Sequence, residues 1–175
     1  CVTMPGVSLM PAPASGEDLV PERVMLRLVP LLKRYFDRVI LDSPAGVGRG
    51  FRAAAAAADC ALIVCNSDPV CIRDASIVRR LLTELEVPQQ RLVINRFNAE
   101  YFGSLSAGRE DVGGLRDLDD VIDQSGVRLI GIVPEDRQMT AAFQRGCVPA
   151  DDLPGMTALS RIAARMNGVS VPLSL

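Results

Sequence analysis

Uninterrupted apolar runs alternate with amphipathic stretches along most of the chain. The runs that stay hydrophobic without alternation predict parallel strands buried on both faces. They are Phe36–Asp42, Cys60–Asn66, Arg91–Asn95 and Val127–Val133, with a shorter one near Val7. The stretches between them predict helices at 19–34, 49–58, 72–85, 117–124, 139–145 and 157–167. Strand and helix in alternation predict an open, doubly wound α/β fold with a mostly parallel sheet flanked by helices.

Within three of these helices, apolar residues recur at helical spacing and predict the buried face. The sets are Val24, Leu28, Leu31 and Leu32; Ile77, Leu81, Leu82 and Leu85; and Leu159, Ile162, Ala163 and Met166. The segment 98–114 is the one long loop that the pattern indicates. Since no linker, internal repeat or low-complexity region divides the sequence, we expect one domain over residues 1–175.

Composition excludes several classes of site. The net charge is −2 and the pI is near 5.2, which argues against a broad basic face for nucleic acid or anionic lipid. The chain has no histidine, and its five cysteines form no CxxC pair, so zinc clusters and Ser-His-Asp triads are excluded. We interpret Cys60, Cys65 and Cys71 as small hydrophobic side chains beside a strand. No apolar run is long enough for a transmembrane helix.

Ligands of doubly wound sheets bind beyond the carboxyl ends of the strands, and Asp42 stands at such an end. Ser43 to Gly46 separate it from the next helix, so it is too far back to be that helix's N-cap, and a role in holding Mg²⁺ through water fits better. The glycines from Gly46 to Gly50 do not form a G-x-x-x-x-G-K-[ST] phosphate loop, because no Lys and Ser/Thr follow. Their expected use is flexibility and close backbone approach to a phosphate.

The later strand ends carry further candidates. Asn95 is either a turn former or a side chain that bonds a purine base through donor and acceptor together. Glu135 and Asp136 follow Pro134, and the alternative for both acids is capping of the helix entered near Met139. Arg73 and Asp74 begin the helix after Pro69, where an acid in the first turn is explained by the helix dipole.

Several collinear segments together resemble one family. They are VSLMPA (7–12), FDRVILDSPAGVGRGF (36–51), ADCALIVCNSDPVCIRDA (58–75), RLVINRF (91–97), LIGIVPED (129–136) and QRG (144–146). In this order they resemble the deviant-Walker-A ATPases of the MinD/ParA group, whose fold is that of P-loop NTPases. The family's first strand and lysine-bearing glycine-rich loop precede the region that matches Val7, and Lys33 is the only lysine here. The resemblance therefore implies that this chain corresponds to the carboxyl-terminal two thirds of such a domain.

The resemblance also implies roles for individual residues. Asp42 would hold the Mg²⁺ shell and Gly46 would sense the γ-phosphate of ATP through its backbone N–H. Asn95 would contact adenine. The other nucleotide-binding positions implied are Arg96, Pro134, Glu135 and Asp136. Binding of ATP and Mg²⁺ is expected only together with the missing phosphate loop, so the chain alone is expected to be inactive as an ATPase.

The family implies partners as well: a homodimer when ATP is bound, a division inhibitor and an ATPase-activating protein. The family's function is the placement of the division site. We expect a cytoplasmic protein, and peripheral association with the inner membrane is left open. The tail does not support membrane association, because residues 157–167 carry only Arg161 and Arg165 and lack a cationic face. The alternatives are a non-catalytic, partner-binding remnant of the fold, or a relative that controls flagellar number, plasmid partition or metal-centre maturation.

Overall fold

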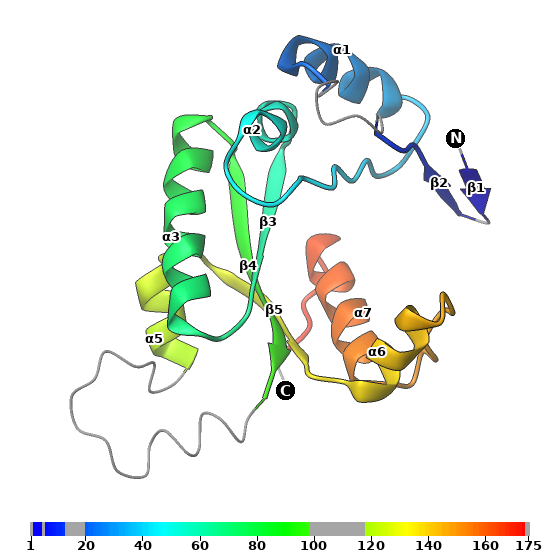
Figure 1. Cartoon of the computed structure of the whole chain (residues 1–175), viewed down its shortest axis with the longest axis vertical. Helices are drawn as coiled ribbons and strands as arrows, with labels where there is room; N and C mark the ends of the chain where they lie inside the picture. The colour runs from blue at the N-terminus through cyan, green and yellow to red at the C-terminus, as the bar shows by residue number, and fades with distance from the viewer. Residues whose placement is uncertain (1, 5, 13–19, 99–117, 174–175) are drawn as a thin grey trace. The chain divides into compact units, whose positions relative to one another are not determined.

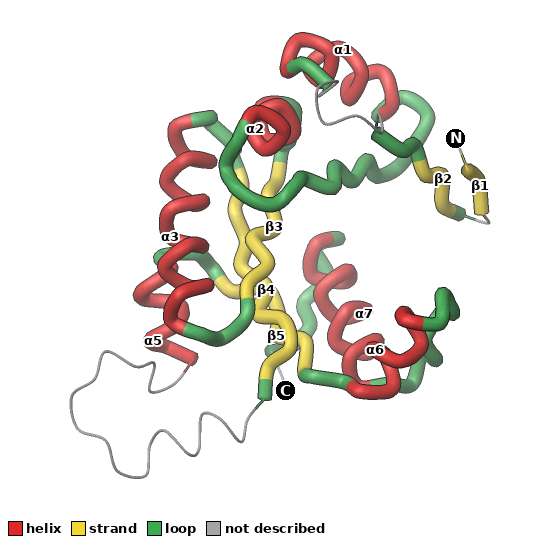
Figure 2. The backbone as a smooth tube through the Cα atoms, in the orientation of Figure 1, coloured by secondary structure: helices red, strands yellow, loops and turns green. Residues whose placement is uncertain are grey.

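The structure, a computed structural model, describes residues 2–4, 6–12, 20–98 and 118–173 (Figures 1 and 2). It divides into two compact units. Unit 1 comprises residues 1–59 and 84–88, and unit 2 comprises residues 60–83 and 89–175. We describe each unit by itself, and the expectation of a single domain stays a prediction. No helix in the described ranges is long and apolar enough to cross a bilayer.

The core of unit 2 is a parallel three-stranded sheet in the order β3-β4-β5. Strand β3 (Cys60–Cys65) pairs with β4 (Gln89–Phe97), and β4 pairs with β5 (Leu129–Pro134). These strands confirm the apolar runs at Cys60, Arg91 and Val127, although β4 extends two residues beyond the predicted end at Asn95. The centres of β4 and β5 are buried, as continuous hydrophobic sequence predicts, because helices cover both faces. The expectation is wrong for β3, whose Leu62 and Val64 are 40% and 58% exposed, so that its side chains alternate between buried and exposed.

Two irregularities interrupt the pairing of β4 with β5. Leu92 pairs with Leu129 but Val93 pairs with Gly131, so Ile130 is an extra residue on β5. The freed Ile130 carbonyl accepts a hydrogen bond of 2.8 Å from Nη1 of Arg165. Further along, Ile94 pairs with Ile132 and the next pair joins Phe97 with Pro134. Two residues of β4 thus lie opposite one residue of β5, so the extra residue of this bulge is on β4. Such bulges bend a strand and redirect its side chains.

Four described helices surround this sheet. They are α3 (Pro69–Glu84), α5 (Leu118–Ser125), α6 (Arg137–Gln144) and α7 (Pro154–Met166). Figure 1 shows α3 and α5 on one face of the sheet and α7 on the other. Helices on both faces of a parallel sheet confirm the predicted α/β architecture.

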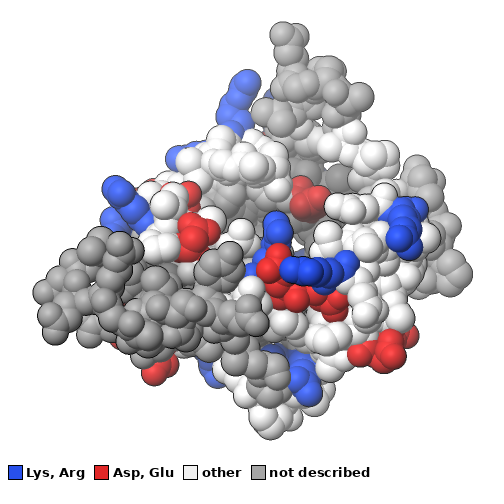
Figure 3. Space-filling view, turned by 60° about the horizontal axis from the view of Figure 1, so that its bottom comes forward, with Lys and Arg blue, Asp and Glu red and all other residues white. Residues whose placement is uncertain are grey.

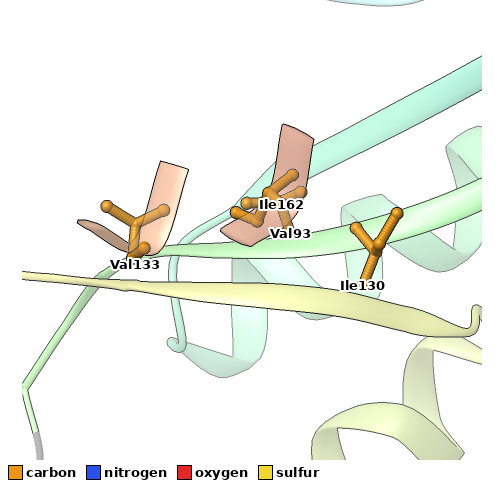
Figure 4. Packing of buried hydrophobic residues seen from close by; sticks show 5 residues of the cluster. Val93, Ile130, Val133 and Ile162 are labelled. Carbon is orange, nitrogen blue, oxygen red and sulfur yellow. The ribbon is translucent and has the colours of Figure 1, made fainter. Parts of the chain in front are cut away.

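Helix α7 packs on a core of Val93, Ile130, Val133, Ala158 and Ile162. Figure 4 shows the strand residues of this cluster projecting to the side of the sheet on which Ile162 lies. The approach is close because Gly131 has no side chain: a Cβ there would lie 2.2 Å from Cγ1 of Ile162. Gly131 therefore sets how near α7 comes to β5.

The predicted buried faces of all three helices are partly wrong. In α1 (Glu22–Leu32), Val24 and Leu31 are 41% and 48% exposed, and the buried residue is Val29. In α7, Ala158 and Ile162 are buried, whereas Leu159 and Met166 are 40% and 42% exposed. In α3, Leu82 is buried together with Ile72 and Ala75, whereas Ile77 is 42% exposed. The buried positions combine large and small side chains: Ile72, Ala75 and Leu82 in α3, and Ala158 and Ile162 in α7. Spacing of large apolar residues alone does not identify such a face.

Unit 1 contains a hairpin and two helices. Strands β1 (Val2–Met4) and β2 (Val7–Leu9) pair antiparallel, with Gly6 at φ +76° in the turn. The apolar run near Val7 is thus a strand, but the expectation that it joins a parallel sheet is wrong. Helices α1 (Glu22–Leu32) and α2 (Arg49–Ala56) follow, with the single lysine, Lys33, in an exposed ion pair with Asp59.

The run Phe36–Asp42 was predicted to be a buried strand, and this is wrong in the structure. It has no strand partner among the described residues, and Ile40 is 89% exposed. Continuous hydrophobicity reports a tendency to be buried, but a parallel strand also needs a neighbouring strand for its backbone hydrogen bonds. Without such a neighbour the segment is irregular from Asp37 to the start of α2.

The contact between Gly131 and Ile162 can be tested with a double-mutant cycle. Gly131→Ala should lower the free energy of unfolding by about 1–3 kcal/mol through overpacking. Ile162→Ala should lower it by about 2–5 kcal/mol by leaving a cavity. Because the second change clears the space that the first one needs, the double variant should lose less than the sum. Urea unfolding followed by circular dichroism measures all three.

Leu159→Ala serves as the matched control, because this side chain of α7 is 40% exposed. It should cost less than Ile162→Ala and should add to Gly131→Ala without coupling. Strict additivity of the changes at 131 and 162 would mean that this contact does not position α7.

Candidate functional site

The candidate adenine contact, Asn95, lies inside the second bulge rather than at a strand end. On β4, two residues, Asn95 and Arg96, lie between the paired residues Ile94 and Phe97. On β5, a single residue, Val133, lies between their partners Ile132 and Pro134. Arg96 adopts φ +52°, a left-handed conformation that costs a non-glycine residue about 1–2 kcal/mol. The Asn95 side chain is half-buried and has no hydrogen bond to a described residue. Its amide therefore keeps both donor and acceptor available.

The ends of β4 and β5 are tied together beside this bulge. The backbone N–H of Glu135 donates to the Phe97 carbonyl at 2.8 Å. Nη2 of Arg96 lies 3.4 Å from Oε1 of Glu135, and both side chains are largely exposed. An exposed ion pair of this length contributes little to stability. Its effect is to hold a guanidinium and a carboxylate at the same edge of the sheet.

Asp136 connects the first turns of two helices. One carboxylate oxygen accepts from the backbone N–H of Met139 at 2.9 Å, which makes Asp136 the N-cap of α6. The other accepts from the backbone N–H of Gly155 at 3.2 Å, in the first turn of α7. These bonds, with that from Met139 the stronger, lower the pKa of Asp136 below its usual 3.8. The capping role that the sequence left open for this acid is therefore present.

The link to α7 depends on a second close approach. A Cβ at Gly155 would lie 2.6 Å from Sδ of Met139 and 3.4 Å from Cβ of Asp136. Glycine at this position lets the backbone N–H come within hydrogen-bonding distance of the carboxylate. The result is a fixed corner in which β5, α6 and α7 meet at one buried carboxylate.

The remaining candidates lie in unit 1. Asp42 is exposed in the irregular segment before α2, and its carboxylate has no bond to a described residue. Gly46 adopts φ +83°, a conformation that favours glycine. Gly48 is the N-cap residue of α2, and its carbonyl accepts from Arg52 N–H at 3.1 Å. The glycines therefore serve a turn and a helix start.

Unit 2 brings Asn95, Arg96, Pro134, Glu135 and Asp136 together at one edge of its sheet. Asp42 and Gly46 belong to unit 1. The predicted Mg²⁺ ligand, Asp42, and the predicted adenine contact, Asn95, are therefore parts of different units. Among the described residues, no group of three acidic, cysteine or histidine side chains is placed to hold a metal ion. A single exposed carboxylate suits Mg²⁺, which keeps several waters and uses phosphate oxygens.

Sequence reasoning missed the true start of α3. Asp68 Oδ1 accepts from the backbone N–H of Cys71 at 2.9 Å, and Pro69 is the first helical residue. The Asp-Pro pair was the signal, since Asp is favoured at N-caps and Pro at the next position. The expectation that Asp74 stands in the first turn is therefore wrong, because the helix begins three residues earlier than predicted. Asp74 lies in the second turn, beyond the strong part of the dipole.

The thiol of Cys65 is held in its protonated form. Cys65 ends β3 and is buried, and burial, with smaller contributions from Cys71 and Asp68, raises its pKa to about 11. A thiol in this state is a poor nucleophile at neutral pH. The interpretation of Cys65 as a small hydrophobic side chain agrees with this environment.

Charged side chains of both signs occur on the face drawn in Figure 3. Lys and Arg stand close to Asp and Glu there, and no continuous basic stripe is visible among the described residues of this face. Nucleic-acid surfaces are typically dominated by one sign of charge. This view agrees with the low net charge of the chain.

Comparison with known proteins gives one consistent result. The septum site-determining protein MinD of Synechocystis is 32% identical over 174 residues, which is 97% of this chain and 62% of that protein. MinD of Bacillus subtilis is 31% identical over 172 residues, covering 95% of this chain and 61% of that protein. This chain thus spans about three fifths of the length of these relatives. No protein-family profile matches it.

Solved structures agree with the sequence relatives. The MinD cell division protein of Aquifex aeolicus gives a TM-score of 0.78 at 29% identity, covering 89% of this chain and 64% of that one. A MinC:MinD complex from the same organism gives 0.77 at 29% identity, covering 89% and 63%. MinD of Pyrococcus horikoshii, solved with Mg-ADP, gives 0.67 at 20% identity, covering 83% and 56%, which is a likeness of fold.

Replacing Asp136 should change both the stability and its pH dependence. A carboxylate with a lowered folded-state pKa stabilises the fold fully above the unfolded value near 3.8, and this contribution is lost as pH falls through the lower folded value. Asp136→Asn should lower the melting temperature at neutral pH and flatten its decline below pH 3.8. Thermal melts across acidic and neutral pH measure both effects.

Glu135→Gln is the control, because Glu135 is exposed and pairs only weakly with Arg96 among the described residues. It should leave the melting temperature and its pH profile close to those of the parent chain. An Asp136→Asn variant that melts like the parent at neutral pH would show that the two helix caps contribute nothing measurable.

Proposed function

Because the chain is related to the MinD/ParA family, we propose that it acts in an ATP-dependent switch of the MinD type, in which ATP binding and hydrolysis control dimerisation and the placement of the division site. The observation that carries this proposal is the similarity to MinD proteins over 97% of the chain in sequence and over 89% of it in fold. The activity, the nucleotide and the partners all belong to the proposal, since the chain spans only part of those relatives.

The Asn95 bulge supports the proposed nucleotide site. A half-buried amide with unused donor and acceptor, next to a strained backbone, is suited to reading the edge of a purine. The exposed Arg96–Glu135 pair lies at the same edge and leaves both groups able to exchange partners. We assign Asn95 to adenine, with Arg96, Pro134 and Glu135 lining its pocket.

Asp136 fits the pocket differently from the other residues. Both of its carboxylate oxygens already accept backbone N–H groups, so it supports the pocket as a positioning residue. In this role it fixes the turn after Pro134 against α6 and α7. A direct bond from its side chain to a nucleotide is not required.

Asp42 and Gly46, in unit 1, carry the proposed catalytic roles. The free Asp42 carboxylate fits the task of holding a water of the Mg²⁺ shell, and Mg²⁺, when bound, neutralises charge on the phosphates. Gly46 would present its backbone N–H to the γ-phosphate. A phosphate-binding lysine is expected in addition, and Lys33 is paired with Asp59. We therefore expect ATP and Mg²⁺ to bind only together with a lysine-bearing phosphate loop.

Proposed partners follow from the same relationship. The MinC:MinD complex of Aquifex aeolicus supports a division inhibitor as one partner. A homodimer formed with ATP and an ATPase-activating protein complete the proposed cycle. The second candidate is a partner-binding module without a nucleotide site, which the engaged lysine and the engaged Asp136 carboxylate favour.

Titration calorimetry with Mg-ATP tests the proposal on this chain and on the chain extended upstream to the start codon of its gene. We expect binding by the extended chain alone. Within it, Asn95→Ala should weaken ATP and ADP about equally, by roughly tenfold for one lost bidentate contact. Asp42→Ala should abolish hydrolysis while nucleotide binding persists.

Asp37→Ala is the matched control for Asp42, since Asp37 is an exposed acid of the same segment. It should bind and hydrolyse ATP like the parent. If the extended chain binds no nucleotide, the ATPase proposal fails and the partner-binding module replaces it.

A further inference from the structure

Two cysteines lie where strand β3 passes into helix α3. Cys65 is the last residue of β3, and Cys71 is in the first turn of α3, which begins at Pro69. Figure 1 shows α3 running back along the sheet after this short connection. The end of the strand and the start of the helix are therefore neighbours in space as well as in sequence.

Both side chains line one hollow between β3 and α3. Its volume is about 220 Å³, and the strand contributes Ile63 and Cys65 to its lining. The helix contributes Cys71, Ala75 and Val78, which share one helix face because positions three and four apart are neighbours. The two thiols thus border the same small space, one from the strand and one from the helix.

Hydrogen bonds hold the Cys71 sulfur beside the end of β3. The thiol donates to the Asp68 carboxylate, whose Oδ1 also accepts the backbone N–H of Cys71 at 2.9 Å. The backbone N–H of Asn66 donates to the same sulfur. Since Asn66 directly follows Cys65, this second bond places the Cys71 sulfur next to the residue that carries the other thiol.

The surroundings keep both thiols protonated at neutral pH. The hydrogen bond to Asp68 is the largest cause that raises the pKa of Cys71, ahead of burial and of the negative charges of Asp68 and Asp74. Burial raises the pKa of Cys65 to about 11. Cys71 is partly exposed, whereas Cys65 is buried. Because the thiolate is the nucleophile and needs access to its target, Cys71 is the thiol that reacts first.

We propose that Cys65 and Cys71 form an oxidative modification site, at which a small-molecule disulfide such as oxidised glutathione converts them into an intramolecular disulfide. The Cys71 thiolate attacks one sulfur of the oxidant, which releases one glutathione and leaves the other bound to Cys71. The Cys65 thiolate then attacks the Cys71 sulfur from within the hollow and releases the second glutathione. The two thiol protons pass to the released thiolates, so one oxidised glutathione yields one protein disulfide and two reduced glutathiones.

The bridge ties the end of β3 to the first turn of α3. Because both thiols are held protonated, exchange is slow at neutral pH, and the site responds to sustained rather than brief exposure to an oxidant. Disulfides of this reversible kind are the ones found in reducing compartments. The reaction needs no nucleotide and no phosphate loop, so it stands independently of the proposed switch.

Peptide mapping of the whole chain identifies the bridge. Trypsin releases Cys60, Cys65 and Cys71 in one peptide, residues 53–73, so Cys60→Ser leaves only the two proposed partners in it. The folded Cys60→Ser chain is treated with oxidised glutathione, its free thiols are alkylated, and it is digested. In mass spectrometry the peptide should lack two hydrogens and carry no alkyl group. Dithiothreitol, added before alkylation, should reverse the change.

Cys65→Ser in the same background tests the order of the two steps. With the second thiol removed, glutathione should stay on Cys71 and the adduct should accumulate. Cys71→Ser should react much more slowly, because the remaining thiol is buried. The Cys60→Ser chain is the matched control for both, since it differs from them by one further Cys→Ser change.

Asp68→Asn tests the control by the carboxylate. Asn caps a helix as well as Asp does, so the start of α3 is kept while the charged acceptor of the Cys71 thiol is removed. The pKa of Cys71 should fall, and the bridge should form several-fold faster at neutral pH, with the rate profile shifted to lower pH. Stopped samples taken across a pH series measure these rates.

Circular dichroism melts establish that each variant remains folded, and the result for the Cys60→Ser chain does not depend on the variant at the buried position 65. The proposal is overturned if glutathione stays on Cys71 in the Cys60→Ser chain as it does in the Cys65→Ser variant, because Cys65 then does not reach that sulfur. A bridge that forms only in urea also overturns it, since the folded hollow would then play no part.

Discussion

Helix α7 can lie against the sheet because Gly131 has no side chain. From that close approach Ile162 reaches the core, and Arg165, one turn later, reaches the carbonyl that the first bulge leaves unpaired. Arg165 also donates to the carbonyls of Val171 and Pro172, so the segment after the helix is held by the same guanidinium. One missing Cβ thus determines packing, backbone hydrogen bonding and the path of the chain after α7.

The candidate nucleotide edge depends on the same kind of local irregularity. The second bulge turns Asn95 out of the regular alternation of β4, and the left-handed backbone at Arg96 allows β4 to continue to Phe97. The Phe97 carbonyl then holds Glu135, and the next residue caps α6. A regular strand would have buried or paired the Asn95 amide, so the proposed adenine contact depends on the bulge.

Most of the fold was predictable because hydrophobic periodicity reports local structure. The helices and the strands at Cys60, Arg91 and Val127 follow from it. The errors arise where distant parts of the chain decide the outcome. The run Phe36–Asp42 is as apolar as a strand but has no neighbouring strand among the described residues. In α3 the face toward the sheet is formed by Ile72, Ala75 and Leu82, so Ile77 faces outward. Asn95 and Glu135 could be singled out as polar residues beside apolar strands. The sequence could not predict that these two residues lie close together, because their positions depend on the bulges and hence on the register between β4 and β5.

Asp136 accepts hydrogen bonds from the first turns of both α6 and α7, so an acid at this position in a sequence does not by itself indicate nucleotide binding. Its carboxylate satisfies two helix starts, so folding alone gives a reason to keep an acid at this position. A descendant that had stopped binding nucleotide would still be under selection to retain it. Asn95, whose amide bonds no described neighbour, has no such structural reason. If Asn95 has the proposed adenine contact, loss of its amide would accompany loss of nucleotide binding, whereas the acid at position 136 would be retained for the fold.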